Sequence, residues 1–163
     1  MQRIAVLVAA LALSACVGTP GPAVFSPQES AYVLAAGQGE IVGRAFLARD
    51  GKIVATAAGG SAVLLPATAY HSERMRTLYG AGKQKVLGTG PDPEPPADFA
   101  RYRRIAKVDA EGRFTFAGVA PGTYYVITAI ALPGEGKPQL IGVYESVTVP
   151  VSGASVEVTL AGA

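Results

Sequence analysis

The sequence is poor in the side chains that most often carry chemistry. It has one cysteine, one histidine and no tryptophan among 163 residues. A lone cysteine cannot close a disulfide within the chain, and one histidine with one cysteine cannot supply the ligands of a zinc site. A formal net charge of only +2 provides no long-range field to attract nucleic acid. We therefore expect no metal, no cofactor and no nucleic-acid partner.

The position of the single cysteine gives it a specific meaning. Residues 1–3 form a short, positively charged start, and residues 4–13 are wholly apolar. This run is shorter than the roughly 20 residues that span a bilayer, but it suits the apolar region of a secretory signal peptide. No later segment is long and apolar enough to cross a membrane. The chain therefore begins with an export signal.

The residues that follow resemble the lipoprotein signal of bacteria, in which leucine and two small residues precede a cysteine. Leu13, Ser14, Ala15 and Cys16 match that motif at every position. The resemblance implies that residues 1–15 are removed and that Cys16 carries acyl chains such as palmitate. It also implies an outer-membrane location, because Val17 stands where an aspartate would retain the protein in the inner membrane. The resemblance does not indicate whether the protein lies on the periplasmic or the outer surface of that membrane. The alternative is an ordinary signal peptide with Cys16 incidental.

Residues 16–38 form the lipidated cysteine, a tether and a short helix. The glycines and prolines of residues 17–25 indicate a flexible to extended spacer. Ser26, Pro27 and Glu29 then form the signature of a helix start, with a capping serine, proline at the first position and glutamate three residues after the cap. We expect a helix over residues 27–36 that ends at Gly37. Continued linker, or a strand through residues 32–34, remains open.

From residue 39 onward the hydrophobic period changes to two, which is typical of strands. Asp50-Gly51 has the chemistry of a hairpin turn, and Pro66 ends an apolar run that suits a central strand. About seven short strands at regular spacing predict an all-β fold, an antiparallel β-sandwich. The expected strands cover residues 40–47, 53–57, 61–65, 113–116, 123–132, 139–149 and 155–160, and residues 101–108 are a plausible further strand.

Within this region the sequence resembles the carboxypeptidase regulatory-like domain, a small transthyretin-like sandwich. The resemblance covers residues 39–163, and its specific part is an acidic-Gly turn, Gly-x-Phe-x-Phe, a short loop and Pro-Gly-x-Tyr. It implies a non-enzymatic, structural or binding domain, related in fold to starch-binding-like modules. The matching residues are Gly112, Phe114, Phe116, Pro121, Gly122 and Tyr124.

The chain departs from that family in a loop insertion at about residues 67–100. Long loops in compact domains are usually functional or disordered. We expect a helical turn or two over residues 71–79, a flexible stretch over residues 80–85 and a stiff, proline-rich stretch over residues 91–96. A candidate binding surface for lipid phosphates, a glycan or an acidic partner consists of Arg74, Arg76, Arg101, Tyr102, Arg103 and Arg104. The alternative is a solvated loop whose charges discourage edge-to-edge pairing.

Few residues suit catalysis. His71, Ser72 and Glu73 are neighbours in sequence, whereas a catalytic triad brings distant residues together, so we interpret His71 as a surface histidine. Tyrosines 102, 124, 125 and 144 could include a sugar-stacking platform, although Tyr124 and Tyr125 face opposite sides of a strand and at least one belongs to the core. We expect no catalytic residues and no enzyme.

The sequence thus predicts a lipid-anchored cell-envelope protein whose sandwich is a non-catalytic binding or structural module. Its partners would be the membrane, through acyl chains on Cys16, and an envelope protein or glycan. The alternative is a carbohydrate-binding module of starch-binding-like fold. A hydrolase is a third, disfavoured interpretation, because the catalytic inventory is empty.

The anchor can be tested by changing Cys16→Ala, which removes the thiol that accepts the lipid. We expect the variant to accumulate as an uncleaved precursor in a pulse-chase experiment with membrane fractionation. Normal maturation and normal membrane partition of this variant would contradict the lipoprotein interpretation.

Overall fold

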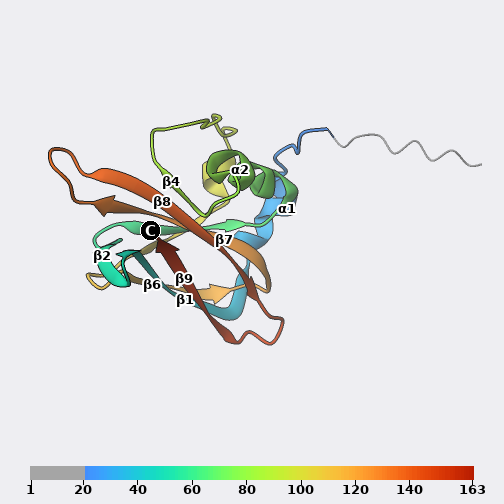
Figure 1. Cartoon of the computed structure of the whole chain (residues 1–163). Coiled ribbons are helices and arrows are strands. Elements are labelled where there is room, and N and C mark those ends of the chain that lie inside the picture. The colour runs from blue at the N-terminus through green and yellow to red at the C-terminus, as the bar shows by residue number, and fades with distance from the viewer. Residues whose placement is uncertain (1–20) are drawn as a thin grey trace, which may run out of the picture.

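The computed structural model describes residues 21–163, so the predicted signal peptide and Cys16 lie outside the described residues. Two β-sheets pack face to face, and a helix covers the outer face of one of them (Figure 1). The first sheet contains β1 (Ala36–Arg49), β2 (Lys52–Thr56), β6 (Arg113–Val119) and β9 (Ser155–Gly162). The second runs in the order β4 (Gln84–Val86), β8 (Gln139–Val149), β7 (Gly122–Leu132), β3 (Ser61–Pro66) and β5 (Arg104–Lys107).

The predicted all-β sandwich is confirmed, with two differences in detail. The described residues form nine strands rather than about seven, and one of them, Gln84–Val86, pairs with β8 and overlaps the end of the stretch over residues 80–85 that we expected to be flexible. In addition, β9 pairs with β1 in parallel, from Glu40 opposite Ser155 to Leu47 opposite Gly162. All other strand pairs are antiparallel.

The turns follow the expected chemistry. Asp50 and Gly51 both have positive φ, 51° and 73°, and Arg49 pairs with Lys52 across them. Positive φ at both central residues defines the two-residue hairpin that best matches the twist of the flanking strands. Pro66 is the last residue of β3, and β3 is an inner strand with β7 and β5 on either side.

The aromatic residues of the Gly-x-Phe-x-Phe and Pro-Gly-x-Tyr segments lie in the core. Phe114 and Phe116 are each 3% exposed, and Tyr124 is fully buried with its hydroxyl donating to the Ala120 carbonyl at 2.7 Å. The Phe114 ring lies directly over Gly43, so closely that a Cβ on Gly43 would come within 2.1 Å of it. An apolar ring that fills the space above a strand glycine fixes the pairing of the two strands.

The N-terminal helix is shorter than expected. The α-helix α1 spans Pro27–Ser30 and continues as a 3₁₀ helix, Ala31–Leu34, whereas Gly37 already belongs to β1. The Ser26 side chain caps it by accepting a hydrogen bond from the Glu29 backbone at 3.3 Å. The Tyr32 hydroxyl then bridges two loops, because it donates to the Thr123 carbonyl and accepts from the Ala67 backbone.

The insertion combines regular structure with loop, because residues 87–98 form no helix or strand. It contains the helix α2 (Ala69–Tyr79), strand β4 and a 3₁₀ turn, η2 (Phe99–Arg101). The predicted helical segment over residues 71–79 is therefore confirmed and begins two residues earlier, where Thr68 caps it. Side chains fasten α2 to the outer face of the second sheet: the Tyr125 hydroxyl donates to Ser72 Oγ at 2.9 Å, and Tyr79 packs on Tyr144 at 4.5 Å between ring centroids.

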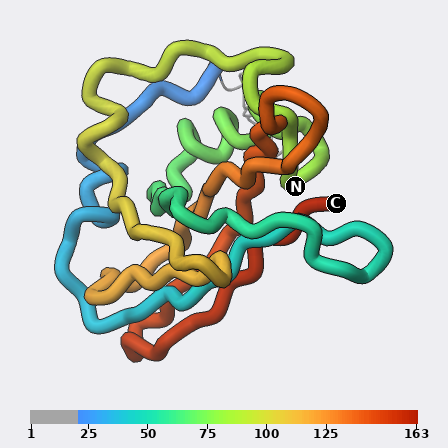
Figure 2. The backbone as a smooth tube through the Cα atoms, turned by 90° about the vertical axis from the view of Figure 1, so that its left-hand side faces the viewer, coloured from blue at the N-terminus to red at the C-terminus, as the bar shows by residue number. Residues whose placement is uncertain are grey.

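The N-terminal segment and the insertion lie side by side. Figure 2 shows the blue tube of the first described residues running beneath the yellow-green arch of the insertion. Within residues 21–163, no helix covers the outer face of the first sheet (Figure 1). Among the helices of residues 21–163, none is long and apolar enough to cross a membrane.

Candidate functional site

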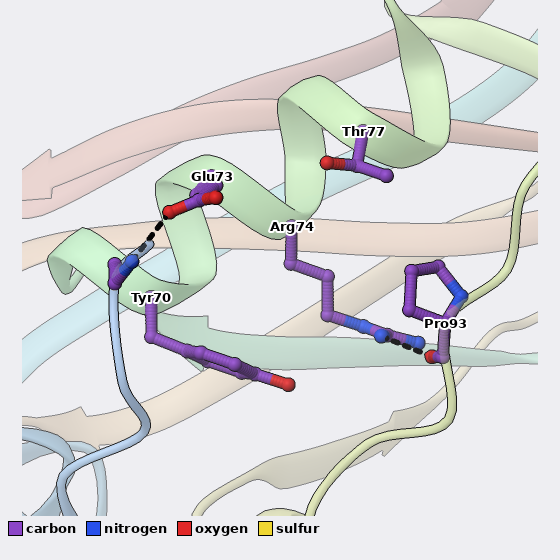
Figure 3. Close-up of a pocket in the computed structure, with 6 residues that line it drawn as sticks. Tyr70, Glu73, Arg74, Thr77 and Pro93 are labelled. Carbon is purple, nitrogen blue, oxygen red and sulfur yellow. Dashed lines mark hydrogen bonds between the residues drawn. The ribbon is translucent and has the colours of Figure 1, made fainter. Parts of the chain in front are cut away.

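A small pocket lies on the outward face of α2, and we call it the α2 pocket. Tyr70, Glu73, Arg74 and Thr77 line it at the spacing i, i+3, i+4 and i+7, which places all four on one side of a helix. Ala23 from the N-terminal segment and Pro93 from the proline-rich stretch complete the walls (Figure 3). The cavity measures about 140 Å³. Three segments distant in sequence therefore build one site.

Arg74 holds the proline-rich stretch against α2. Its guanidinium donates to the Pro93 carbonyl and pairs with the Asp92 carboxylate at 3.2 Å. It also lies over the ring of Phe99, 5.4 Å from the centroid, in cation–π geometry. The Arg74 side chain is only 11% exposed, so these contacts fix the position of its remaining donor groups at the pocket wall.

Glu73 holds the opposite wall. Its Oε2 accepts a hydrogen bond from the Ala23 backbone at 2.7 Å (Figure 3). Its other carboxylate oxygen accepts no hydrogen bond within residues 21–163, and neither do the hydroxyls of Tyr70 and Thr77. A carboxylate, two hydroxyls and a fixed guanidinium thus face one cavity.

An aromatic cluster lies beside this pocket and is centred on Phe25. Its ring meets Tyr70 at 5.4 Å, Tyr102 at 5.8 Å and both His71 and Phe99 at 6.0 Å, mostly edge to face. Such geometry is favourable for aromatic pairs. The Phe25 cluster joins the N-terminal segment to α2 and η2, so Ala23 and Phe25, at the end of the predicted spacer, contact the domain, whereas Val24 between them is exposed.

His71 is fully buried, which corrects its interpretation as a surface histidine. Its ring stacks on Phe99 at 5.3 Å, Nδ1 lies 2.7 Å from Thr68 Oγ1, and Nε2 has no hydrogen-bond partner within residues 21–163. Burial, reinforced by the Arg74 charge, lowers the pKa of His71 from 6.5 to about 4. The ring is therefore neutral at physiological pH.

The hydroxyl of Ser72, which follows His71, is hydrogen-bonded to other residues. Ser72 donates to the Thr68 carbonyl at 2.8 Å and accepts from Tyr125. The neighbours His71, Ser72 and Glu73 consequently do not form a hydrogen-bonded relay. Within residues 21–163, no three histidine, cysteine or acidic side chains gather in a way that could hold a metal ion.

The residues of the predicted basic surface do not form one patch, because they differ in exposure and in their contacts. Arg76 and Arg103 are exposed, and Arg101 pairs with Asp98 at 3.3 Å. Arg104 has a structural role instead, because it donates to the carbonyls of Ala117 and Gly118 on β6 and so links the two sheets. Tyr102 packs in the Phe25 cluster. Only part of the predicted surface thus surrounds the α2 pocket.

The tyrosines do not form a flat platform. Tyr124 is buried, as expected for one of the pair Tyr124 and Tyr125. Tyr125 and Tyr144 lie on the outer face of the sheet with their rings inclined by 72°, and Tyr79 packs on Tyr144 at 52°. Burial and the neighbouring Tyr144 raise the pKa of Tyr79 to about 12. These three rings fasten α2 to the sheet.

Sequence reasoning missed Tyr70, Thr77 and Pro93 as site residues and treated Glu73 only as a neighbour of His71. The signal that could have found the helical residues was their spacing, which matches one face of a helix over residues 69–79. Nothing in the sequence indicated that Pro93 and Ala23 would stand on either side of them, because neither segment has a periodic pattern.

Comparison with known proteins shows similarity to a solved structure. No family model matches the chain, and no curated protein matches it either. A crystal structure from Pseudomonas aeruginosa, described as a "putative carbohydrate binding protein", is 28% identical and superposes with a TM-score of 0.66. The similarity covers 86% of this chain and 99% of that one. The sandwich is therefore a fold shared with a protein that has been described as carbohydrate binding.

Burial of neutral His71 makes stability depend on pH. Between about pH 6.5 and 4 the unfolded chain binds a proton at this histidine and the folded chain does not, so the free energy of unfolding falls as the pH falls. A shift of this size corresponds to at most about 3 kcal/mol. We expect His71→Phe, which retains the stacking on Phe99, to lose this part of the pH dependence in urea denaturation at pH 7, 5.5 and 4.5. An identical pH dependence in both proteins would contradict the assignment.

Proposed function

We propose that this protein is a non-catalytic module of the cell envelope that binds a carbohydrate in the α2 pocket. The observation that carries the proposal is the extensive similarity to the carbohydrate-binding candidate from Pseudomonas aeruginosa, which spans nearly the whole of that chain. This similarity favours a sugar over a protein as the ligand. The chemistry of the pocket supports the same choice independently.

Sugars present an apolar face of C–H groups and a ring of hydroxyls, so their sites combine an aromatic or apolar wall with a few fixed polar groups. Tyr70 and Pro93 supply apolar walls, while Glu73, Arg74 and Thr77 supply acceptors and donors. The residues that hold Arg74 and Glu73 in place also reduce the ordering that binding would require. The pocket is thus arranged before the ligand arrives.

The size of the pocket limits what it can enclose. Cavities for drug-sized ligands measure about 300–1,000 Å³, whereas the α2 pocket measures about 140 Å³. We therefore propose that it takes one unit of a glycan, such as a chain end, and leaves the remainder in solvent. Modest affinity for a single sugar follows from such a small buried area.

The lipid anchor remains part of the proposal. Leu13, Ser14, Ala15 and Cys16 support it through their match to the lipoprotein signal, and Val17 supports an outer-membrane location. An anchored module with a small glycan site would gain affinity from being held beside its ligand, because the second contact becomes intramolecular. Acyl chains on Cys16 and a modest sugar site are therefore compatible parts of one binding protein.

A protein partner is the second candidate, and the edge of the first sheet favours it. Strand β9 is eight residues long and pairs with β1 alone among the strands of residues 21–163. A strand with one unpaired edge can accept an extended segment of another protein by strand addition. This route would use the sandwich at a distance from the α2 pocket.

The sugar site is tested by screening the purified chain on a glycan array and measuring the best ligand by titration calorimetry. Thr77→Val keeps the shape of the pocket and removes a hydroxyl, and Glu73→Gln keeps an oxygen that can accept from Ala23. Loss of one hydrogen bond costs about 0.5–1.5 kcal/mol, so we expect each variant to bind roughly 2- to 10-fold more weakly.

The matched control is Thr115→Val, which makes the same change at an exposed position on the uncovered face of the first sheet. It should bind like the unaltered chain. Absence of any glycan ligand would contradict the proposed function, and binding that is unaffected at Thr77 and Glu73 would show that the sugar occupies another site.

A further inference from the structure

The N-terminal segment leaves the domain at a defined place on α2. Ala23 is hydrogen-bonded to Glu73, and Phe25 packs among the aromatic rings of α2 and η2. A larger groove of about 540 Å³ lies on the other side of the same segment, where Gly21 and Pro22 face Ala69 and Arg76. The chain is thus held against α2 at Ala23, two residues after the first described residue, and at Phe25.

Little chain separates this place from Cys16. Five residues lead from Cys16 to Gly21, and an extended chain spans at most about 3.6 Å per residue. The Cα atom of Cys16 therefore lies within about 18 Å of the Cα atom of Gly21. If residues 21–25 did not contact the domain, eight residues would separate Cys16 from Phe25 and the domain could turn any side toward the membrane. Because Ala23 and Phe25 are held on the domain, fewer sides of the domain can face the membrane.

We propose that the side of the domain formed by α2 and residues 21–25, here called the α2 face, lies against the lipid headgroups of the membrane that carries the anchor. The proposal rests on the proposed lipidation of Cys16. The opposite end of the sandwich, at the turn between β8 and β9, points away from that membrane. Both views place α2 at the top and this turn at the bottom (Figures 1 and 2).

The charges on the α2 face suit this placement. Arg76, beside Gly21 and Pro22, and Arg103, next to Tyr102 of the Phe25 cluster, are both exposed. Two of the nearby acids are paired with other arginines, Asp92 with Arg74 and Asp98 with Arg101, and Glu73 is hydrogen-bonded to the Ala23 backbone. The two exposed arginines can thus meet lipid phosphates, which attract basic side chains within a Debye length of the surface.

This orientation narrows the class of glycan that the α2 pocket meets. The pocket shares Ala23 and Glu73 with the groove beside Gly21. It therefore lies close to the point where the chain leads from the domain toward Cys16. Its ligand is consequently a glycan presented at the surface of the same membrane, such as the headgroup of a glycolipid, rather than a polymer on the far side of the envelope.

The absence of tryptophan makes the orientation measurable. The mature chain, residues 16–163, is coupled through its only cysteine to a maleimide lipid in phosphatidylcholine vesicles that contain a dansyl headgroup lipid. A single tryptophan is introduced either by Ala69→Trp, at the exposed start of α2, or by Val151→Trp, which is 90% exposed in the β8–β9 turn. Energy transfer from tryptophan to dansyl then reports which position is nearer the headgroups.

We expect at least twofold more efficient transfer from position 69 than from position 151. Adding Phe25→Ala to both variants should release the segment and reduce the difference between the two positions. Equal transfer from both, or greater transfer from position 151, would overturn the proposal. Since coupling is chemical, the result does not depend on lipidation in the cell, and glycan binding in solution is tested separately.

Discussion

The packing of Phe25 is the contact on which the functional side of the molecule depends. This one ring meets side chains of α2, η2 and the residue after η2, so it unites segments separated by more than seventy residues. An eleven-residue helix such as α2 is too short to be stable by itself in water and must gain its stability from packing. Phe25 and the tyrosines beneath α2 provide that packing from opposite sides. Both walls of the α2 pocket, Ala23 and Pro93, are held in place as a result.

The sandwich supplies the platform for this arrangement. Its core includes Phe114, Phe116 and Tyr124, and Tyr125 and Tyr144 on the outer face of its second sheet contact α2. Binding residues in many proteins lie on connecting segments that a rigid scaffold positions. Here the connecting segment has its own helix, so the candidate site is placed on regular structure and is preorganised.

The sequence predicted the scaffold well because its signals are local. Alternating apolar residues located the long strands, Asp50-Gly51 located the hairpin, and the spacing of Phe114, Phe116 and Tyr124 placed three core residues. It failed where a residue's environment is made by distant segments. Strand β4 is polar and three residues long, and it becomes a strand only because β8 lies beside it. His71 stands among polar neighbours in sequence and is buried only because Phe25 and Phe99 converge on it.

Hydrogen exchange would test most directly whether Phe25 organises the insertion. The amides of α2 and of residues 91–102 would be compared between the unaltered chain and Phe25→Ala, with the strands β6, β7 and β8 as an internal reference. Loss of the ring should accelerate exchange in α2 and around η2, while exchange in the reference strands stays unchanged, because the sandwich core does not include Phe25. Unchanged exchange in α2 would contradict the central claim that the N-terminal segment and the insertion form one structural unit.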